Sequence, residues 1–323
     1  MTWLRRWGIS IGSLAMGLAT LFVFRRGLPH VGWIVGYTLL LGLVVAVLAE
    51  ARVPLEARGR GRVVSAAEYT IQTLYHNLLL FVLPAYWASA TPTSPNVIFV
   101  AGVALGALIT AIDPLYAALG RQYRWLKHAL LAFSLFAALN VALPLVGVRP
   151  GVALLGSAAL AGLALAPAFR GTGMGWPRAL VRATTAAFIG ISLVWVGREL
   201  VPPAPVFLAA KQVARDVREL EPVDPIDGPI PAATVVEWGG ALAAYTPVHA
   251  PAGLRDTIEH VWWKNGRVIA RVRLSPVEGG RAQGFRTWSR KSDLGMPLDG
   301  DYAVDVRTAS GQLIGRLTFT VTP

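Results

Sequence analysis

The chain has 323 residues, of which 54% are hydrophobic and only 15% are charged, and it contains no cysteine. Soluble proteins carry about 25% charged residues, so this composition predicts a membrane protein. The lack of cysteine excludes disulfides, thiolate catalysis and thiolate metal sites.

The formal net charge of +12 comes almost entirely from the first part of the chain. Residues 1–200 hold 16 Lys or Arg against 5 Asp or Glu, whereas residues 201–323 hold 14 against 13. The basic residues of the first part lie between apolar runs, where loops are expected. This distribution does not favour a nucleic-acid-binding surface.

Seven apolar runs of about 17–23 residues occur in residues 1–200, each near the ~20 residues that cross a bilayer. We therefore predict a seven-helix transmembrane domain over residues 1–200. The predicted spans are Gly8–Phe24, His30–Ala49, Ala66–Ala88, Asn96–Ile112, His128–Val148, Gly151–Phe169 and Ala179–Gly197.

Lys and Arg are concentrated in alternate loops between these runs, and such loops usually face the cytoplasm. With a cytoplasmic N-terminus, the inner segments carry twelve basic residues and the outer loops carry three. This bias predicts a membrane protein with a cytoplasmic N-terminus and an extracytoplasmic C-terminus. The outer basic residues are Arg25, Arg26 and Arg149, and the inner ones are Arg5, Arg6, Arg52, Arg58, Arg60, Arg62, Arg121, Arg124, Lys127, Arg170, Arg178 and Arg182.

The third predicted span carries a polar stripe. Glu68, Gln72 and His76 are spaced i, i+4, i+8 and so share one helix face, and Asn140 in the fifth span lies at a similar depth. Ionisable residues within a span indicate a functional site, here for a proton, an ion or a lipid headgroup. The alternative interpretation is a cluster of interhelical hydrogen bonds.

Residues 201–231 are predicted to connect two domains. Val206–Leu220 has apolar residues at helical spacing and predicts a short amphipathic helix. Glu221–Pro231 is rich in proline and predicts an irregular linker.

Residues 232–323 show short alternating runs separated by turn signals, which predict an extracytoplasmic immunoglobulin-like β-sandwich. An Asn-Gly pair between the first two runs indicates a hairpin. The predicted strands are Thr257–Trp263, Arg267–Leu274, Gly284–Lys291, Asp301–Thr308 and Gln312–Val321.

Five interaction-prone side chains fall on two of these strands: His260, Trp263, Arg286, Trp288 and Ser289. They suggest either core packing or a surface that recognises a ligand. No carboxylate is placed to orient the histidine, and no glycine-rich oxyanion loop is present, so we predict no catalytic residues. The five histidines include no i, i+4 pair, and no phosphate-binding loop follows a strand, so neither a metal site nor a cofactor is predicted.

The motifs His260-Val-Trp262-Trp263-Lys-Asn-Gly266 and Arg286-Thr-Trp288-Ser289-x-Lys291 resemble an uncharacterised bacterial family of C-terminal β domains. The resemblance covers Glu237–Pro323 and includes Gly300-Asp-Tyr-x-Val304-x-Val306 and Phe319-x-Val321. The helical part resembles the multi-span membrane region that accompanies this domain, through Leu83-Pro84-Ala-Tyr86-Trp87 and Asp113-Pro114-Leu115-Tyr116. The resemblance implies a domain architecture and supplies no chemistry.

Together these features predict a polytopic inner-membrane protein whose periplasmic β module binds a protein or glycan of the cell envelope. The alternative is a transporter or intramembrane enzyme that uses the polar stripe of the third span. The lipid bilayer is the one partner that both interpretations share.

Overall fold

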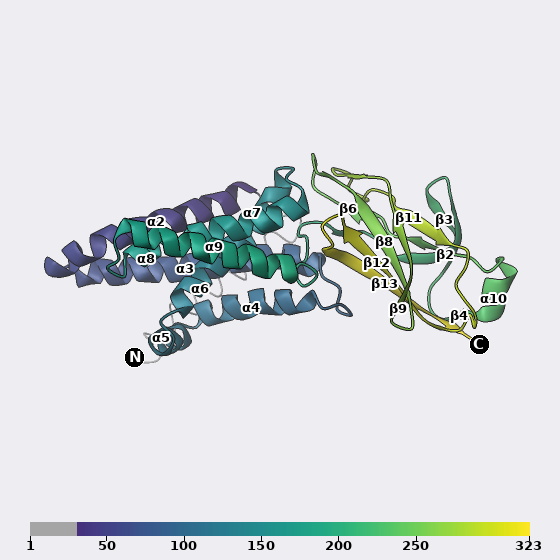
Figure 1. The fold of residues 1–323 in the computed structure, drawn as a ribbon, viewed down its shortest axis with the longest axis horizontal. Helices are drawn as coiled ribbons and strands as arrows, with labels where there is room; N and C mark the ends of the chain where they lie inside the picture. Colours follow the sequence, from purple (N-terminus) through teal and green to yellow (C-terminus); the bar gives the residue numbers. More distant parts are fainter. Residues whose placement is uncertain (1–30) are drawn as a thin grey trace, which may run out of the picture. The chain divides into compact units, whose positions relative to one another are not determined.

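The computed structural model describes residues 31–323, which form helices in the first part of the chain and mainly strands in the second (Figure 1). The helices are α2 (Val31–Ala57), α3 (Gly61–Ala88), α4 (Val97–Ala111), α5 (Asp113–Gln122), α6 (Leu126–Leu145), α7 (Pro150–Leu163), α8 (Leu165–Arg170), α9 (Trp176–Val196) and α10 (Ala232–Glu237).

Thirteen strands follow α9 in the chain. They are β1 (Phe207–Leu208), β2 (Gln212–Arg218), β3 (Glu221–Ile226), β4 (Ile230–Pro231), β5 (Leu242–Tyr245), β6 (Val248–His249), β7 (Arg255–Asp256), β8 (Ile258–Lys264), β9 (Arg267–Arg273), β10 (Val277–Glu278), β11 (Trp288–Lys291), β12 (Gly300–Thr308) and β13 (Leu313–Thr322).

The chain divides into two compact units. The helical unit contains the chain up to Ala85 together with Ile98–Ala142 and Val152–Gly197. The β-rich unit contains Arg198–Pro323 and also two loops between helices, Tyr86–Val97 and Leu143–Gly151. These two loops are outer loops in the topology that the sequence predicts.

Six of the seven predicted spans coincide with helices of the model, and the span Gly8–Phe24 lies outside the described residues. By length and composition, four helical segments of residues 31–323 could cross a membrane, or five if α4 and α5 together form one span. A membrane-spanning helical region is therefore supported, whereas the number seven is not. Helix α3 is not among these segments, because its polar residues lower its hydropathy.

The break between α4 and α5 bends the chain by 101°. Pro114 stands in the first turn of α5, where its missing N–H costs no hydrogen bond and its ring disfavours continuing α4. Helix α4 therefore ends at Ala111, and α5 begins at Asp113.

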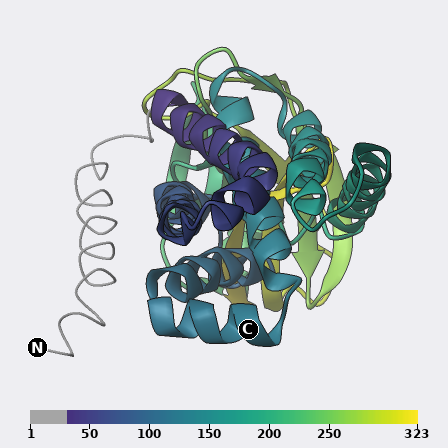
Figure 2. The same ribbon diagram turned by 90° about the vertical axis from the view of Figure 1, so that its left-hand side faces the viewer.

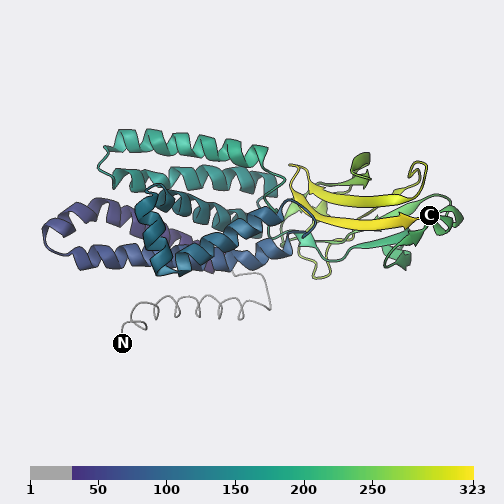
Figure 3. The same ribbon diagram turned by 90° about the horizontal axis from the view of Figure 1, so that it is seen from below.

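Within the helical unit, α9 runs alongside the α7–α8 segment (Figure 3). A side-chain carbon at Gly162 would lie only 2.3 Å from the Cα of Ala187, so the two helices approach as closely as glycine permits. A view along the helices shows α2 and α9 at the rim of the unit (Figure 2). Leu39 of α2 and Phe188 of α9 are 68% and 70% exposed, which suits contact with lipid.

The β-rich unit has two larger sheets that share one core. A five-stranded sheet has the order β4-β13-β12-β8-β9, and a four-stranded sheet has the order β11-β5-β2-β3. Trp262, Tyr302 and Phe319 of the first sheet pack in one cluster with Val213 and Leu242 of the second. The predicted β region is thus confirmed as a β-rich unit with its own core.

The hairpin predicted at Asn265-Gly266 joins β8 to β9 in antiparallel register. Both residues have positive φ, 48° and 76°, as a tight two-residue hairpin turn requires. The strands predicted near the C-terminus appear as β11, β12 and β13, with ends shifted by a few residues.

The predicted amphipathic helix over Val206–Leu220 is wrong, because this segment forms β1 and β2. Glu219 and Leu220 adopt positive φ and turn the chain into β3, so β2 pairs with β3 on one side and β5 on the other. Long-range pairing has overridden a helical periodicity of only four turns.

The segment predicted as an irregular linker, Glu221–Pro231, contains β3 and β4. β3 is at the edge of its sheet, where Pro222 and Pro225 are tolerated because only one side of the strand needs hydrogen bonds. The strands of the β-rich unit therefore begin well before residue 232.

Candidate functional site

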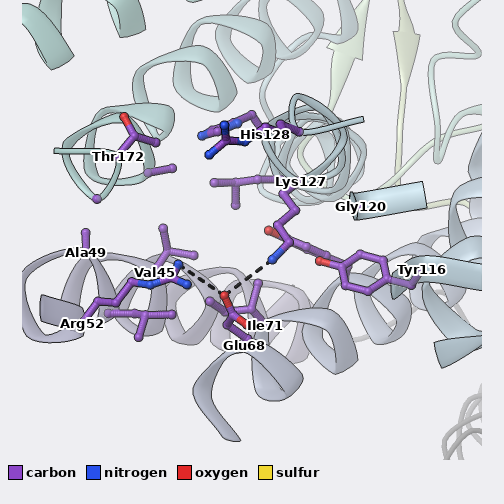
Figure 4. Close-up of a pocket in the computed structure, with 16 residues that line it drawn as sticks. Val45, Ala49, Arg52, Glu68, Ile71, Tyr116, Gly120, Lys127, His128 and Thr172 are labelled. Carbon is purple, nitrogen blue, oxygen red and sulfur yellow. Dashed lines mark hydrogen bonds and ion pairs between the residues drawn. The ribbon is translucent and has the colours of Figure 1, made fainter. Parts of the chain in front are cut away.

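The helical unit contains a cavity of about 590 Å³, here called the Glu68 cavity (Figure 4). Its walls come from α2, α3, α5, α6 and α8 and from the turns that follow α5 and α8. The polar lining consists of Arg52, Glu68, Tyr75, Tyr116, Arg124, Lys127, His128 and Thr172, and the rest is Val45, Leu48, Ala49, Ile71, Gly120, Leu131, Ala168 and Gly171.

One carboxylate stands among the cations of this cavity. Oε1 of Glu68 lies 3.4 Å from Nη1 of Arg52 and 3.5 Å from Nζ of Lys127 (Figure 4). The side chains of Glu68, Arg52 and Lys127 are 36%, 45% and 48% exposed. Ion pairs of this length and exposure contribute about 0–1 kcal/mol, so they can be exchanged for other partners.

The cavity has more positive than negative charge. Arg52, Arg124 and Lys127 carry three positive charges, and Glu68 is the single carboxylate among the described residues of the lining. Arg52 also pairs through Nε with Glu56 at 3.1 Å, whereas Arg124 makes no ion pair with residues 31–323. The balance favours an anionic ligand.

The apolar part of the lining is continuous with helices that could cross a membrane. Val45 and Ala49 come from α2, Leu131 comes from α6 and Ala168 comes from α8. A charged wall beside an apolar wall fits an amphiphile, with the head at the cations and the chain along the helices.

A second cavity of about 320 Å³ lies beside the first. The two cavities share Glu68, Tyr116, Gly120 and Lys127 in their linings. The second cavity is completed by Ser65, Tyr69, Gln72, Ala117 and Arg121. Glu68 therefore borders both spaces.

The remaining residues of the predicted polar stripe hold helices together. Gln72 donates to the backbone oxygen of Thr110 at 2.9 Å and to Oδ1 of Asp113 at 2.7 Å. Nδ1 of His76 lies 3.1 Å from the backbone oxygen of Ala107. These contacts match the interhelical hydrogen-bond interpretation for Gln72 and His76, while Glu68 at the end of the stripe reaches the cavity.

Asn140 of α6 is 2% exposed and does not line either cavity around Glu68. The structure therefore does not bring Asn140 together with Glu68 in one site, although both were candidates.

In the β-rich unit, two of the five candidate residues are buried and bonded to each other. His260 is 0% exposed; Nδ1 lies 2.7 Å from Oγ of Ser289, and Nε2 lies 2.8 Å from Oγ1 of Thr246. Ser289 also accepts a hydrogen bond from Nε1 of Trp262 at 2.9 Å. Burial lowers the pKa of His260 to about 3, so its imidazole is neutral.

The other three candidates lie nearer the surface. Nε1 of Trp263 donates to Oδ2 of Asp305 at 3.0 Å, and Nη2 of Arg286 lies 2.7 Å from Oε1 of Glu221. Trp288 packs against a small cluster that contains Tyr245. One tryptophan of the Trp262-Trp263 pair is thus in the core and the other is half-buried, as the alternation of the strand predicts.

Trp263 also borders a groove of about 870 Å³ in the β-rich unit. The groove runs along β13, with Leu317 and Phe319 in its lining, and residues of β2 and β3 lie across it. Its charged lining residues are Lys211, Asp227, Asp301 and Arg316. None of His260, Arg286, Trp288 or Ser289 borders this groove.

No group of three or more His, Cys, Asp or Glu within residues 31–323 is arranged to hold a metal ion.

The cations of the Glu68 cavity were not among the predicted site residues. Arg52, Arg124 and Lys127 indicated only a cytoplasmic side, yet Arg52 of α2 and the pair at the start of α6 line one space. One feature of the sequence could have indicated the site: these three cations and Glu68 are all predicted to lie near the cytoplasmic side of the membrane.

Comparison with known families gives two matches. A model described as a family of unknown function (DUF5924) matches residues 2–231, which is more than half of the chain. The chain belongs to the DUF5924 family. A second model, for a protein of unknown function (DUF2914), matches residues 255–321. No curated protein and no solved structure matches the chain.

These matches confirm the predicted relationship to families of unknown function. The DUF5924 match includes every element that lines the Glu68 cavity, and the DUF2914 match includes β8, β12 and β13. Neither description assigns a reaction or a ligand.

Proposed function

We propose that this DUF5924 protein is a membrane protein whose helical unit binds the phosphate headgroup of an anionic lipid in the Glu68 cavity. One observation carries the proposal: Arg52 of α2 and the pair Arg124 and Lys127 at the start of α6, which are distant in the sequence, line one cavity, and Glu68 is the single carboxylate among the described residues of its lining. Arg and Lys are the usual partners of phosphate, and Arg can bind it with two parallel hydrogen bonds.

The surroundings of the cavity support a lipid over a soluble anion. Apolar side chains of α2, α6 and α8 continue the lining, and the exposed faces of α2 and α9 suit a bilayer. Basic pockets between transmembrane helices on the cytoplasmic side are typical sites for anionic headgroups. The sequence predicts that side for all three cations.

The proposal is tested with the purified full chain in mild detergent. Binding of phosphatidic acid and of phosphatidylcholine with the same acyl chains is measured by native mass spectrometry. We expect phosphatidic acid to bind about tenfold more tightly, because phosphatidylcholine adds a positive charge beside three cations.

Arg124→Gln is the test variant, and Arg58→Gln is its matched control, because Arg58 is exposed and lines neither cavity. We expect Arg124→Gln to weaken phosphatidic acid binding about tenfold and Arg58→Gln to leave it unchanged. Equal binding of the two lipids, or equal weakening by the two variants, contradicts the proposal. Displacement of the lipid by inorganic phosphate at similar concentration identifies a free anion as the ligand instead.

A second candidate function concerns the β-rich unit, which we propose to be an immunoglobulin-like module in the periplasm that binds an envelope protein or glycan. The groove of about 870 Å³ beside Trp263 supports it, since half-buried tryptophans are common at recognition surfaces. The loops Tyr86–Val97 and Leu143–Gly151 also support this topology, because both are predicted outer loops and both belong to the β-rich unit. Capture of an envelope component by the full chain, but not by a Trp263→Ala chain that still folds, is the expected result.

The structure adds no support for transport or for an intramembrane reaction at Gln72 and His76, whose described contacts join α3 to α4 and to the first residue of α5. That role stays a prediction from the sequence.

A further inference from the structure

The carboxylate of Glu68 occupies the position that a phosphate would need. A single oxygen, Oε1, is shared by Nη1 of Arg52 at 3.4 Å and Nζ of Lys127 at 3.5 Å. These two cations come from α2 and α6. Glu68 is the one carboxylate among the described residues of the lining, so its side chain alone supplies negative charge to both of them. A headgroup that binds both must take the place of Glu68.

The second cavity offers the displaced side chain a destination. Glu68 lines both cavities, and Arg121 lines only the second. Arg121 makes no ion pair with residues 31–323, so its charge is available to a carboxylate. A change of side-chain rotamer at Glu68 exchanges one positive environment for another.

We infer that Glu68 is a specificity-determining residue that competes with the lipid phosphate for Arg52 and Lys127 and turns toward Arg121 when the headgroup binds. This inference rests on the proposed lipid-binding function. It predicts a narrower ligand class than anionic lipids in general, because the incoming group must outcompete a carboxylate that is already in place.

A phosphomonoester meets that requirement better than a phosphodiester. A monoester carries about −1.5 to −2 charges at pH 7, whereas a diester carries one charge, the same as the carboxylate it replaces. Exchange of Glu68 for a monoester therefore adds negative charge between two cations, and exchange for a diester does not. The preferred ligand is a lipid with a terminal phosphate.

The test uses two probes, phosphatidic acid as the monoester and phosphatidylglycerol as the diester. Four full-length chains are compared: the native chain, Glu68→Gln, Arg121→Gln and the double variant. Dissociation constants are measured in the same detergent, and the thermal unfolding midpoint of each chain is recorded.

For the native chain we expect phosphatidic acid to bind about tenfold more tightly than phosphatidylglycerol. Glu68→Gln removes the competing charge and keeps the length of the side chain. It is expected to tighten phosphatidylglycerol binding about tenfold and to reduce the preference for the monoester.

Arg121→Gln reports on the destination of Glu68. It is expected to weaken phosphatidic acid binding about threefold in the native background and to have no effect when Glu68→Gln is present, because the two residues then no longer interact. This coupling separates the inference from a simple loss of positive charge, which would act equally in both backgrounds.

The inference is overturned if Glu68→Gln binds both lipids as the native chain does, or more weakly, while its thermal midpoint is unchanged. It is also overturned if Arg121→Gln has the same effect on binding with and without Glu68→Gln. If Glu68→Gln lowers the midpoint, Glu68→Asp replaces it, since this side chain keeps the charge but is one methylene shorter and so competes less well for the two cations. It must then reduce the monoester preference as well, or the inference fails. A native chain that binds neither lipid better than phosphatidylcholine refutes the proposed function itself.

Discussion

The two units each contain a carboxylate between two basic side chains, and they hold it in opposite ways. In the β-rich unit, Asp305 is 0% exposed and accepts hydrogen bonds from Nε of Arg316 at 2.5 Å, Nη2 of Arg307 at 3.0 Å and Nε1 of Trp263 at 3.0 Å. In the helical unit, Glu68 is 36% exposed, and one of its oxygens lies 3.4 Å and 3.5 Å from its two cations.

The difference separates a structural ion network from a site that can exchange partners. A buried carboxylate is stable only when its hydrogen-bonding capacity is filled, and removal of one member leaves an uncompensated charge. An open pair gains little from its partners and loses little when a ligand replaces one of them.

Asp305→Asn is expected to have the largest effect. It leaves Arg307 and Arg316 without their shared buried counter-charge and is expected to destabilise the β-rich unit by about 3–5 kcal/mol. Pulse proteolysis of the full chain in urea measures the loss. Asp227→Asn, at an exposed aspartate, is the control and should change stability by less than about 0.5 kcal/mol. Similar losses for the two variants would contradict a structural role for the Asp305 network.

His260 makes the stability of the β-rich unit depend on pH. Burial lowers its pKa from 6.5 to about 3, so the neutral form is favoured in the folded state. The stabilising contribution is present above pH 6.5 and is lost as the pH falls toward 3, because only the unfolded state binds the proton easily. Between pH 7 and pH 5 the unit should lose about 2 kcal/mol from this residue.

The same pulse-proteolysis measurement at pH 7 and pH 5 checks the effect. His260→Gln removes the titrating group, so between pH 7 and pH 5 its free energy of unfolding should fall by about 2 kcal/mol less than that of the native chain. The same slope in both chains would show that His260 is not the group that titrates.

Trp263→Phe separates the hydrogen bond of the indole from its ring. The variant keeps most of the aromatic contact but removes the donor to Asp305, which should cost about 1.5 kcal/mol because the acceptor is charged. In the Asp305→Asn background the same substitution should cost less, because the charged acceptor is gone. Additive effects of the two substitutions would contradict a direct bond.

Glu68→Gln is expected to have the smallest effect on stability, less than about 1 kcal/mol, because the ion pairs that it removes are long and exposed. Thermal unfolding of the full chain in detergent measures it. A loss as large as that of Asp305→Asn would remove the distinction between the two carboxylates.

Much of the fold follows from local patterns in the sequence. The apolar runs located six helices of the described part, and the Asn265-Gly266 turn located the β8–β9 hairpin. Val206–Leu220 was predicted incorrectly because its periodicity of apolar residues fits a helix. The segment instead turns directly into β3, and its pairing with β5 depends on contacts far along the chain. Long-range pairing of this kind has no local signature.

The candidate site was predictable only in part. The spacing of Glu68, Gln72 and His76 correctly placed them on one face, but only the structure shows that Gln72 and His76 bond to α4 while Glu68 meets Arg52 and Lys127. Arg52 lies far in the sequence from Arg124 and Lys127, and their convergence depends on how the helices pack.

The most direct test of the proposed lipid site is a crosslinking measurement with a photoreactive phosphatidic acid on the full chain in a bilayer. If the Glu68 cavity binds the headgroup, labelled peptides will come from the end of α2, the start of α3 and the turn between α5 and α6, and Arg124→Gln will reduce this labelling. Labelling spread evenly over the exposed faces of α2 and α9, and unchanged by Arg124→Gln, would contradict the account.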